Sequence, residues 1–456
     1  MRRRVNKNRS VVIFMVLIVI PVLAFIYNTA IFERNEPYVV LDEEIYWNLK
    51  NPIAAKVKDD SGVKRVLIQI SDGENNITLA NNKYSGSDKE IDFNISFPKT
   101  GFFSKKNQYY LTFEVVDKSL WNFFMGNRIQ KVYSVIVDTK QPSVYTVVNS
   151  YKVTKGGSGM VIFKADDENL KDVYIQTNYG KQFRAAPFNK KGYYIAFVAW
   201  PVNQKNFSAE IIAEDLAGNI AKNRIKYFLQ DKNYRVSRIA LSDNFLNNSV
   251  YPLAEEFDYE GTKNLSALER FVFVNEKIRD DSLSTIQQVT STVNYNKTFR
   301  LRPFFPLKNG AVVAGYGDFR MYEYNKNLLS QSYHLGLDMA STAEAEIVLS
   351  NSGTVAFADE NGIYGKMVLI DHGLGLYSLY AHCSELSVNK EDEMINGQVI
   401  GRTGKTGFVF GDHLHFGIVV QGIEVRPEEW MDEKWLKENV FDLVESANKA
   451  INGIGR

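Results

Sequence analysis

The histidines of this chain are confined to one short stretch. All five lie between His334 and His415 in a chain of 456 residues. Four of them fall in three motifs, which read HLGLD from His334, YAHCS around His382, and GDHLHFG with His413 and His415. Imidazole both ligates zinc and moves protons near neutral pH. We therefore expect the chemistry in this stretch, whereas the remaining residues must anchor, position or regulate it.

A zinc site can be assembled from these motifs. Catalytic zinc takes three protein ligands, commonly histidine nitrogen and carboxylate oxygen, and keeps one position open for water. His334, Asp338 and one histidine of the GDHLHFG motif supply that set. The other histidine of that motif and His382 are then left for proton transfer. The sequence contains no HExxH motif, so histidine must replace the glutamate base of that motif.

The motifs alternate polar and apolar residues, which is typical of β-strands. In HLGLDMA the polar His334 and Asp338 alternate with leucines, and Tyr380 and His382 share a parity in the same way. We therefore expect an antiparallel sheet with one buried face and a zinc-bearing groove on the other. His372 lies in a turn-like Asp-His-Gly segment. It is expected to be a core histidine with satisfied hydrogen bonds.

The N-terminus predicts export of the chain. Residues 2–9 carry five basic side chains and no acid, and residues 11–32 are uncharged. About 20 apolar residues cross the hydrocarbon core of a bilayer, and flanking positive charges favour the cytoplasmic side. We therefore expect a cytoplasmic basic tail at 1–10 and one transmembrane span at 11–32, with the bulk outside the cytoplasm. A cleaved signal peptide is the alternative, but its apolar core is normally shorter, about 7–15 residues.

Residues 36–230 have the alternation and turn residues of short β-strands. They also contain an internal echo, because KVKDDSGVKRVLIQI at 56–70 resembles FKADDENLKDVYIQT at 163–177. A repeat of roughly 100 residues made of short strands has the size of an immunoglobulin-like sandwich. We predict two such domains in tandem, at 36–139 and 140–230. Sandwich folds carry no function by themselves, so we interpret them as spacers, with partner binding as the alternative.

Helical periodicity surrounds the histidine-bearing segment. Residues 231–300 predict a helical connector, in which Ser266 and Glu269 can form a capping box and Asp280 and Asp281 suit a second helix N-terminus. Residues 433–456 predict an amphipathic helix that packs against its own protein. A partner-binding helix is the alternative there. The catalytic segment between them is expected at 301–432.

Composition excludes some classes of protein. The net charge of +1 gives no basic field for nucleic-acid binding. The single cysteine, Cys383, excludes an intramolecular disulfide and a CxxC metal knuckle. Its parity in the strand turns it away from the expected metal face. With 45% hydrophobic and 23% charged residues, the chain is expected to be an ordered, mainly β, multidomain protein.

The segment from about Leu301 to Trp430 resembles the lysostaphin/LytM-type zinc peptidoglycan metalloendopeptidases, which have the duplicated hybrid motif fold. The resemblance is carried by HxxxD at 334–338, YAH at 380–382 and HxH at 413–415, with GTV at 353–355, DHG at 371–373 and TG at 403–404 in support. It implies that His334, Asp338 and His415 bind zinc. It also implies that His382 and His413 are the catalytic residues.

The same resemblance implies a substrate and a location. The substrate would be the peptide stems or cross-links of bacterial peptidoglycan, cut during wall remodelling, shaping or division. The chain would be a single-pass protein of the cytoplasmic (inner) membrane, with its catalytic domain periplasmic or extracellular. Division or shape proteins are possible partners of the sandwiches.

Three further hypotheses remain open at this point. Some LytM-like domains that have lost zinc ligands activate a separate cell-wall amidase. A mainly structural surface protein built on the sandwiches is another reading of the chain. Finally, the helical segment or the first sandwich is a candidate cover for the groove, because an unrestrained wall hydrolase endangers its cell.

Overall fold

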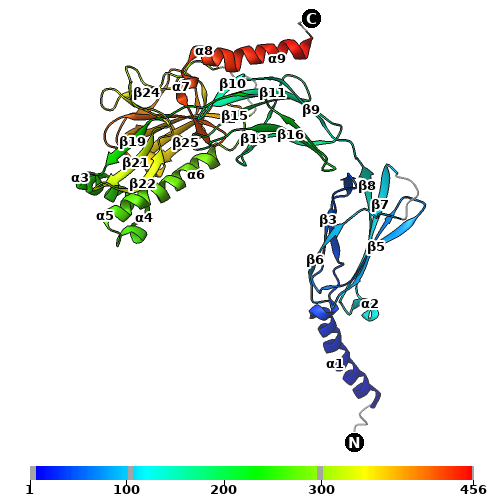
Figure 1. Cartoon of the computed structure of the whole chain (residues 1–456). Coiled ribbons are helices and arrows are strands. Elements are labelled where there is room, and N and C mark those ends of the chain that lie inside the picture. Colours follow the sequence, from blue (N-terminus) through cyan, green and yellow to red (C-terminus); the bar gives the residue numbers. More distant parts are fainter. Residues whose placement is uncertain (1–6, 101–105, 295–300, 454–456) are drawn as a thin grey trace, which may run out of the picture. The chain divides into compact units, whose positions relative to one another are not determined.

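The computed structural model describes residues 7–100, 106–294 and 301–453 (Figure 1). The chain divides into two compact units. The first is Met1–Pro142 with the short segments Glu168–Lys171 and Glu214–Ile220, and the second comprises Ser143–Asp167, Asp172–Ala213 and Ala221–Arg456. The prediction of a mainly β chain is confirmed. Residues 1–6 of the predicted tail, 295–300 of the predicted connector and 454–456 lie outside the described residues.

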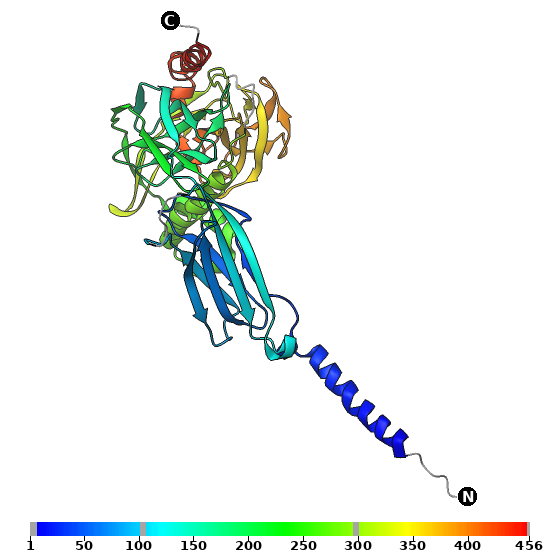
Figure 2. The same cartoon turned by 90° about the vertical axis from the view of Figure 1, so that its right-hand side faces the viewer.

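The first unit begins with the helix α1, Lys7–Asn28, which leads into a β-sandwich (Figure 2). Its window Val11–Asn28 has a mean hydropathy of 2.8, and none of it is buried against the rest of the chain. Length and composition therefore allow this helix to cross a membrane. A signal sequence meets the same criteria, so the membrane anchor stays a prediction. A short 3-10 turn, Ala30–Phe32, follows the helix.

The sandwich of the first unit consists of two sheets, ordered β1-β3-β6 and β2-β8-β7-β4-β5. Alternation along β7 turns Tyr109, Leu111, Phe113 and Val115 into the shared core. The strands are Tyr38–Val40 (β1), Glu44–Trp47 (β2), Ile53–Lys58 (β3), Val63–Ser71 (β4), Asn76–Lys83 (β5), Glu90–Ile95 (β6), Gln108–Asp117 (β7) and Arg128–Val137 (β8). A short turn, α2 (Trp121–Phe124), connects β7 to β8. The immunoglobulin-like assignment stays a prediction.

The second unit begins with two four-stranded sheets, ordered β14-β15-β11-β9 and β13-β12-β16-β17, and a parallel pair, β10-β18. The strands are Ser143–Asn149 (β9), Lys152–Thr154 (β10), Ser158–Asp166 (β11), Leu170–Thr177 (β12), Gln182–Arg184 (β13), Ala186–Pro187 (β14), Tyr193–Ala199 (β15), Ala209–Asp215 (β16), Ile220–Arg224 (β17) and Phe228–Gln230 (β18). These strands form the second repeat of the internal echo. Its immunoglobulin-like assignment likewise stays a prediction.

This second module is bonded to the C-terminal part of its unit. The backbone N–H of Ser158 donates to the Glu429 carboxylate at 3.0 Å. The Gln421 side chain accepts from the N–H of Arg184 at 2.7 Å and donates to its carbonyl at 2.9 Å. These bonds tie the module to its own unit, and its role as a spacer or a partner-binding module stays a prediction.

The C-terminal helix packs on the same module. It runs as α8 (Glu433–Leu436), a π-turn (Lys437–Phe441) and α9 (Asp442–Asn452), and it follows the short helix α7 (Pro427–Trp430). α9 lies against β9 and β11 (Figure 1). Val440 and Ala447 are buried there. The prediction that this amphipathic helix packs against its own protein is confirmed.

The histidine-bearing segment forms one large sheet, ordered β20-β23-β31-β27-β26-β25-β29, with β32 on β31 and a smaller sheet, β24-β30-β28, beside it. The strands are Ala311–Ala314 (β20), Leu337–Ala340 (β23), Glu346–Val348 (β24), Gly353–Glu360 (β25), Lys366–Asp371 (β26), Leu376–Cys383 (β27), Glu385–Leu386 (β28), Glu393–Met394 (β29), Val399–Arg402 (β30), Leu414–Val420 (β31) and Ile423–Val425 (β32). Each residue of β27 and β31 is buried. The expected antiparallel sheet is present, and both faces of its centre are covered.

The predicted connector covers one of these faces. Its helices are α3 (Asp243–Phe245), α4 (Tyr251–Thr262), α5 (Ala267–Phe273) and α6 (Arg279–Val289), with π-turns at Leu246–Val250 and Val274–Ile278. Their buried side chains, such as Phe271 and Ile286, share one core with Leu379 and Val419 of the large sheet. The predicted capping box of Ser266 is present.

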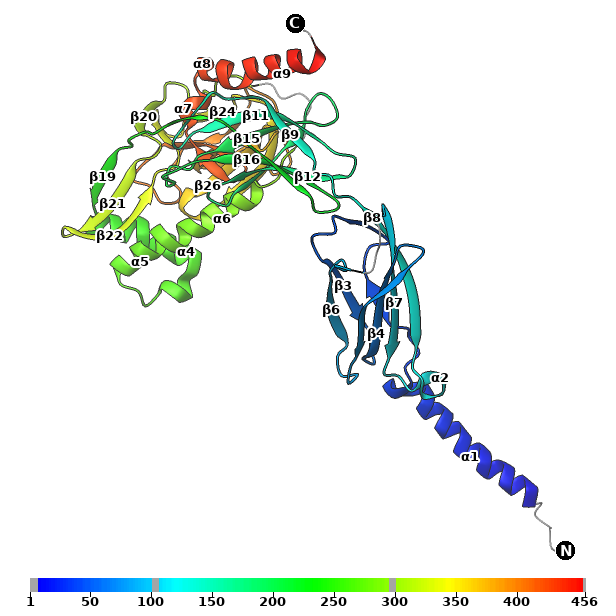
Figure 3. The same cartoon turned by 45° about the vertical axis from the view of Figure 1, so that its right-hand side comes forward.

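The connector also contains a strand, which its helical periodicity did not reveal. β19 (Val236–Ala240) pairs in parallel with β21 (Phe319–Tyr324), and β21 pairs with β22 (Asn327–Tyr333). Helix α5 and the π-turn that follows it contact β22 of this small sheet, and α4 and α5 lie near it in Figure 3. Connector and histidine-bearing segment therefore fold together and enclose a cleft.

Candidate active site

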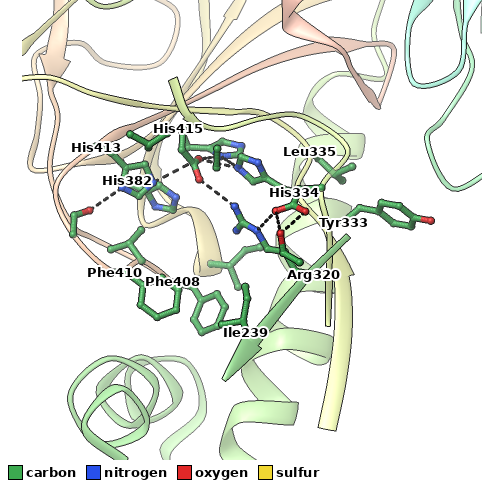
Figure 4. Close-up of a pocket in the computed structure, with 18 of the residues that line it drawn as sticks. Ile239, Arg320, Tyr333, His334, Leu335, His382, Phe408, Phe410, His413 and His415 are labelled. Carbon is green, nitrogen blue, oxygen red and sulfur yellow. Dashed lines mark hydrogen bonds and ion pairs between the residues drawn. The ribbon is translucent and has the colours of Figure 1, made fainter. Parts of the chain in front are cut away.

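A cleft of about 580 Å³ lies where the large sheet meets the small sheet β19-β21-β22. His334, Asp338, His382, His413 and His415 all line it (Figure 4). The opposite wall carries apolar side chains, including those drawn in Figure 4 from the connector and from the loop at 408–410. The structure thus brings together every residue that the sequence singled out as a candidate ligand or catalyst.

Strand pairing places the candidate ligands side by side. Asp338 of β23 is the direct partner of His415 of β31, and His334 directly follows β22 in the short loop before β23. The Asp338 Oδ1 atom lies 2.8 Å from His334 Nε2 and 2.9 Å from His415 Nδ1. The two ring nitrogens are 3.1 Å apart. These three residues are all buried.

Carbonyl groups fix how the histidine rings are oriented. His334 Nδ1 lies 2.8 Å from the carbonyl oxygen of Gly315, and His382 Nδ1 lies 2.9 Å from that of Thr406. His413 Nδ1 lies 2.8 Å from the oxygen of Gly411. A carbonyl oxygen only accepts hydrogen bonds, so each of these Nδ1 atoms carries the proton and each Nε2 keeps its lone pair for the cleft.

Gly336 explains how the ligand strands approach so closely. A Cβ atom at this position would lie 2.5 Å from His415 Nε2 and 2.7 Å from the carbonyl oxygen of Phe416. A Cβ atom cannot tolerate such contacts, and therefore only glycine fits between the two candidate ligands of the HLGLD motif. His415 Nε2 itself is buried and has no hydrogen-bond partner.

His382 reaches the cleft by leaving the strand geometry. Its φ is +62°, in the left-handed region that residues other than glycine rarely adopt. Its ring lies 4.9 Å from that of His413 and 5.7 Å from that of His415, centroid to centroid. Tyr380 packs instead on Phe416, on the other face of the sheet. The prediction that Tyr380 and His382 share one face is wrong, because it assumed an extended backbone at His382.

Two other predictions in this segment are confirmed. His372 is buried, its Nδ1 lies 2.9 Å from the carbonyl oxygen of Ser352, and its Nε2 lies 2.7 Å from the Ser378 hydroxyl. Burial lowers its pKa to about 4, so it is a neutral core residue. Cys383 is fully buried away from the cleft, and burial raises the pKa of its thiol to about 12.

The cleft shifts the pKa values of its titratable groups in opposite directions. Burial alone would raise the pKa of Asp338, but hydrogen bonds and charge from His334, His413 and His415 hold it well below its usual range. Burial lowers the pKa of His415 to about 4 and, with the neighbouring histidines, holds that of His382 well below 6.5. Burial opposes protonation of His413 too, yet Asp338 raises the pKa of that ring. The aspartate is thus a stable anion among mostly neutral imidazoles.

Sequence reasoning missed the arginines of the cleft. Arg235, Arg238, Arg279 and Arg320 line its wall. Arg320 Nη2 lies 3.3 Å from the Oδ2 atom of Asp338, the carboxylate oxygen that faces away from the histidines. Arginines are common in strands and helices, and these four share no motif, so the sequence carried no signal for them.

The residues present fit a zinc ion. His334, Asp338 and His415 offer two imidazole nitrogens and one carboxylate oxygen, all within 4.8 Å of one another. Ligand atoms of a tetrahedral zinc site are separated by roughly 3.3 Å, given bonds of about 2.0–2.1 Å. The separations of 2.8 to 3.1 Å are close to that value. Three candidate protein ligands beside a cleft would leave a fourth position for water or substrate.

Residues 332–427 match the model of peptidase family M23. This part of the chain is an M23 peptidase domain. The predicted family resemblance is therefore confirmed for the domain.

Relatives of this M23 domain carry different functional names. DD-carboxypeptidase/endopeptidase Mpg of Neisseria meningitidis serogroup B is 35% identical over 106 residues, which are 23% of this chain and 24% of that protein. Murein hydrolase activator NlpD of Salmonella dublin is 31% identical over 107 residues, 23% of this chain and 28% of that protein. The chain thus spans about a quarter of the length of these relatives. The catalytic domain of the antimicrobial peptidase lysostaphin from Staphylococcus simulans aligns with a TM-score of 0.23 at 25% identity, over 27% of this chain and 92% of that one.

Proposed function

We propose that this protein is a membrane-anchored zinc metalloendopeptidase that hydrolyses peptide stems or cross-links of bacterial peptidoglycan during wall remodelling, shaping or division. One observation carries the proposal. The three candidate ligands and the two further histidines meet in one cleft of an M23 domain. A domain that only bound a partner would have no need for this complete set.

In this proposal the metal is held by His334 Nε2, Asp338 Oδ1 and His415 Nδ1. A bound Zn²⁺ supplies a Lewis acid and lowers the pKa of water from about 15.7 toward 7. The Gly315 carbonyl holds the His334 ring so that Nε2 faces the ligand cluster. Arg320 holds the second oxygen of Asp338, which orients the first toward the histidines.

His382 and His413 carry the proton chemistry. Each has its Nδ1 proton committed to a carbonyl oxygen, so Nε2 is the atom that accepts a proton from the attacking water and returns it to the departing amine. Positioned acid–base groups of this kind contribute about 10²–10⁴-fold to a rate. A protonated His413 also places an N–H where the carbonyl oxygen of the substrate becomes negative.

The arginines of the wall favour an acidic substrate. Peptidoglycan stems are peptides with free carboxylates, and a guanidinium group binds a carboxylate with two parallel hydrogen bonds. Arg235 and Arg238 are exposed at the cleft. They would hold such a carboxylate while the neighbouring peptide bond lies over the histidines.

The decisive experiment is digestion of purified peptidoglycan by the whole chain, followed by mass spectrometry of the fragments. We expect new peptide termini with zinc present, none after chelation, and recovery when zinc is restored. Asp338→Asn removes a ligand, whereas Asp359→Asn changes an exposed aspartate outside the cleft and serves as the matched control. Unchanged fragments with the Asp338→Asn variant would overturn the proposal.

The activator function is the second candidate, because NlpD carries that name. A zinc-free chain that stimulates a purified cell-wall amidase, and releases no fragments by itself, would establish it. Retention of normal biological activity by His415→Ala would instead favour a structural surface protein.

The membrane anchor has its own test. We expect the mature protein to remain in the membrane fraction and to keep residues 11–32, as measured by intact mass. A mature chain that begins after residue 30 would identify a signal peptide instead.

A further inference from the structure

A cluster of three acids, two of them buried, lies in the first unit, far along the chain from the histidines. It consists of Glu33, just after α1, Asp59, in the turn after β3, and Asp117, at the end of β7. One carboxylate oxygen from each lies within 4.8 Å of the others. Asp117 is fully buried, and Asp59 is 5% exposed.

This cluster has buried oxygens with nothing to bind. The Oδ2 atom of Asp59 and the Oε2 atom of Glu33 are both buried without a hydrogen-bond partner. Among the residues that the structure describes, no lysine or arginine lies within ion-pair distance of the three carboxylates. Burial, together with the neighbouring acids, raises the pKa of Glu33. Buried anions without partners are costly, so a positive charge is missing from this arrangement.

The other oxygens of the cluster are held by a rigid frame. Asp117 accepts from the backbone and the side chain of Asn127, both at 2.7 Å, and Asn127 donates to the carbonyl of Glu33 at 3.0 Å. Asp215, Asn219 and Asp138 repeat this frame at 2.8, 2.8 and 2.9 Å. The internal repeat of the sequence has thus kept this acid-holding turn in both copies.

We propose that Glu33, Asp59 and Asp117 form a binding site for a calcium ion. Ca²⁺ takes oxygen ligands only, accepts irregular geometry, and completes its shell with water. Mg²⁺ demands a near-ideal octahedron, which three side chains from separate segments supply poorly. A bound ion would tie the residues that follow α1 to two turns of the sandwich. It would therefore fix how this domain is mounted on the helix.

The test is calcium titration of the zinc-loaded whole chain in detergent by isothermal calorimetry. We expect a dissociation constant of about 10⁻⁴–10⁻³ M, as in other extracellular modules. Asp59→Asn and Glu33→Gln should each weaken binding at least about tenfold, as expected when one charged ligand is lost. Glu74→Gln, at an exposed residue in the turn between β4 and β5, should not change it.

Zinc content and circular dichroism should stay constant in all three variants. Because Glu33 is only half-buried, its variant should fold even if Asp59→Asn does not. Calcium binding that is equal in the wild type, Asp59→Asn and Glu33→Gln would overturn the proposal. Equal affinity for magnesium would overturn the choice of ion.

A separate observation lies at the tip of the α2 turn. Phe123, Phe124 and Met125 are 93%, 67% and 69% exposed. Asn122, Phe123 and Phe124 all have positive φ, at 52°, 56° and 66°. Bulky residues rarely adopt this conformation, and strained backbone of this kind clusters at functional sites. The turn therefore exposes three large apolar side chains, and two of them, Phe123 and Phe124, have a backbone conformation that is unfavourable for bulky residues.

This turn lies beside the end of α1 in all three views (Figure 1, Figure 2, Figure 3). Three contacts join the turn to the end of α1. The Leu120 N–H donates to the Ile31 carbonyl at 2.7 Å, and the Phe124 and Phe32 ring centroids are 6.5 Å apart. The Arg34 guanidinium lies 4.3 Å from the centroid of the Tyr27 ring and 4.5 Å from that of the Trp121 ring. If α1 spans the membrane, its end marks the bilayer surface. The exposed tip is then at the depth where aromatic side chains gather.

We infer that Phe123, Phe124 and Met125 insert into the outer surface of the bilayer next to α1. This inference rests on the membrane anchor of the proposed function. The occupant is lipid rather than protein, because the contacts to Ile31 and Phe32 fix the tip at the end of the span. Large apolar side chains at that level bury their area among acyl chains and headgroups.

Spin labels on the whole chain in phospholipid vesicles test this inference. The labelled positions are Phe123→Cys at the tip, Ile18→Cys within α1, and Asn76→Cys at the opposite end of the sandwich. Cys383 is fully buried, so the chain without an added cysteine gives the background. We expect oxygen to relax the labels at 18 and 123 more than a water-soluble nickel complex does, and the reverse at 76.

The three positions separate the two possible failures. A label at 18 exposed to nickel would refute the anchor itself. A buried label at 18 with an exposed label at 123 would refute only the insertion of the tip.

Discussion

Among the described residues, the histidine cluster and the acidic cluster of the first unit each bring together three potential ligands, and they differ in chemistry. His334, Asp338 and His415 combine two imidazoles with one carboxylate, whereas Glu33, Asp59 and Asp117 are carboxylates only. The imidazoles surround their anion with polar N–H and N groups, which lowers the pKa of Asp338. Burial raises the pKa of Glu33 and Asp117, and it outweighs the N–H groups of Asn35 and Asn127 that lower these two values.

The difference in ligand atoms decides which ion each cluster suits and what that ion can do. A mixed nitrogen and oxygen set suits zinc, a strong Lewis acid, and its histidines can also move protons. An oxygen-only set suits a hard cation that holds segments together without doing chemistry. We therefore expect the histidine cluster to act in catalysis. We expect the acidic cluster to fix the orientation of the sandwich relative to α1.

The largest effect should come from the histidine cluster. His415→Ala removes one ligand, and we expect zinc content to fall from one ion per chain to near none and wall hydrolysis to fall at least about 10⁴-fold, roughly 5 kcal/mol in barrier. His382→Ala should lose activity by about 10²–10⁴-fold but keep its zinc. Metal analysis beside activity measurement separates the two. Loss of zinc from His382→Ala would mean that this ring is a ligand.

The second effect concerns what supports each cluster. The acidic cluster stands on the core of its own sandwich, whereas the histidine strands share a core with the connector helices. Phe271 is fully buried, and its ring lies 5.1 Å from that of Tyr322. Phe271→Ala should destabilise this part of the chain by about 3–5 kcal/mol.

Calorimetry of the whole chain measures that loss, and Phe305→Ala, at a residue 64% exposed, is the matched control with an expected change below about 0.5 kcal/mol. If both variants melt alike, the connector is not part of the domain core.

The shared core also bears on the hypothesis that the helical segment covers the groove. Deleting residues 231–293 would expose that core, so the activity of residues 301–456 alone cannot test autoinhibition cleanly.

The histidine cluster was predictable because histidine is rare in this chain and its spacings are specific. HLGLD places two candidate ligands four residues apart, and the pairing of β23 with β31 brings His415 of HLHFG beside Asp338. The alternation rule failed for the pair Tyr380 and His382. The positive φ at His382 interrupts the extended backbone, so the two side chains lie on opposite faces of the sheet. Sequence patterns assume regular backbone, so local exceptions of this kind remain invisible to them.

The acidic cluster was not predictable from the sequence. Asp and Glu occur 53 times together in this chain, and acids in turns are ordinary. Glu33 and Asp117 are 84 residues apart by their numbers and meet only through sandwich topology. The same reason hid Arg320, which reaches Asp338 from a neighbouring sheet.

The third effect is a pH dependence that belongs to neither cluster. Glu429 bonds the second module to the M23 domain, and burial raises its pKa to about 7, against the opposing Ser158 N–H and Arg426. A carboxyl whose folded pKa is raised stabilises the fold fully below its unfolded value near 4.5. That contribution is lost as pH rises through 7.

The shift corresponds to at most about 3 kcal/mol. Glu429→Gln keeps an acceptor for Ser158 without a charge. It should therefore flatten the fall in melting temperature between pH 4.5 and 7. Calorimetry at pH 5 and pH 8 checks this, and a variant with the same pH dependence as the wild type would show that Glu429 is not the group responsible.

The smallest effect should come from the acidic cluster, and its measurement tests whether the two clusters are independent. A ligand at ten times its dissociation constant stabilises the form that binds it by about 1.4 kcal/mol. For a domain of this size that corresponds to a rise of roughly 5–10 °C in the melting temperature of the first unit. Calcium should produce this rise in the wild type and not in Asp59→Asn, whereas chelation of zinc should leave that transition unchanged. If calcium instead shifts the transition of the M23 domain, the ion acts at the histidines and the two clusters are not independent.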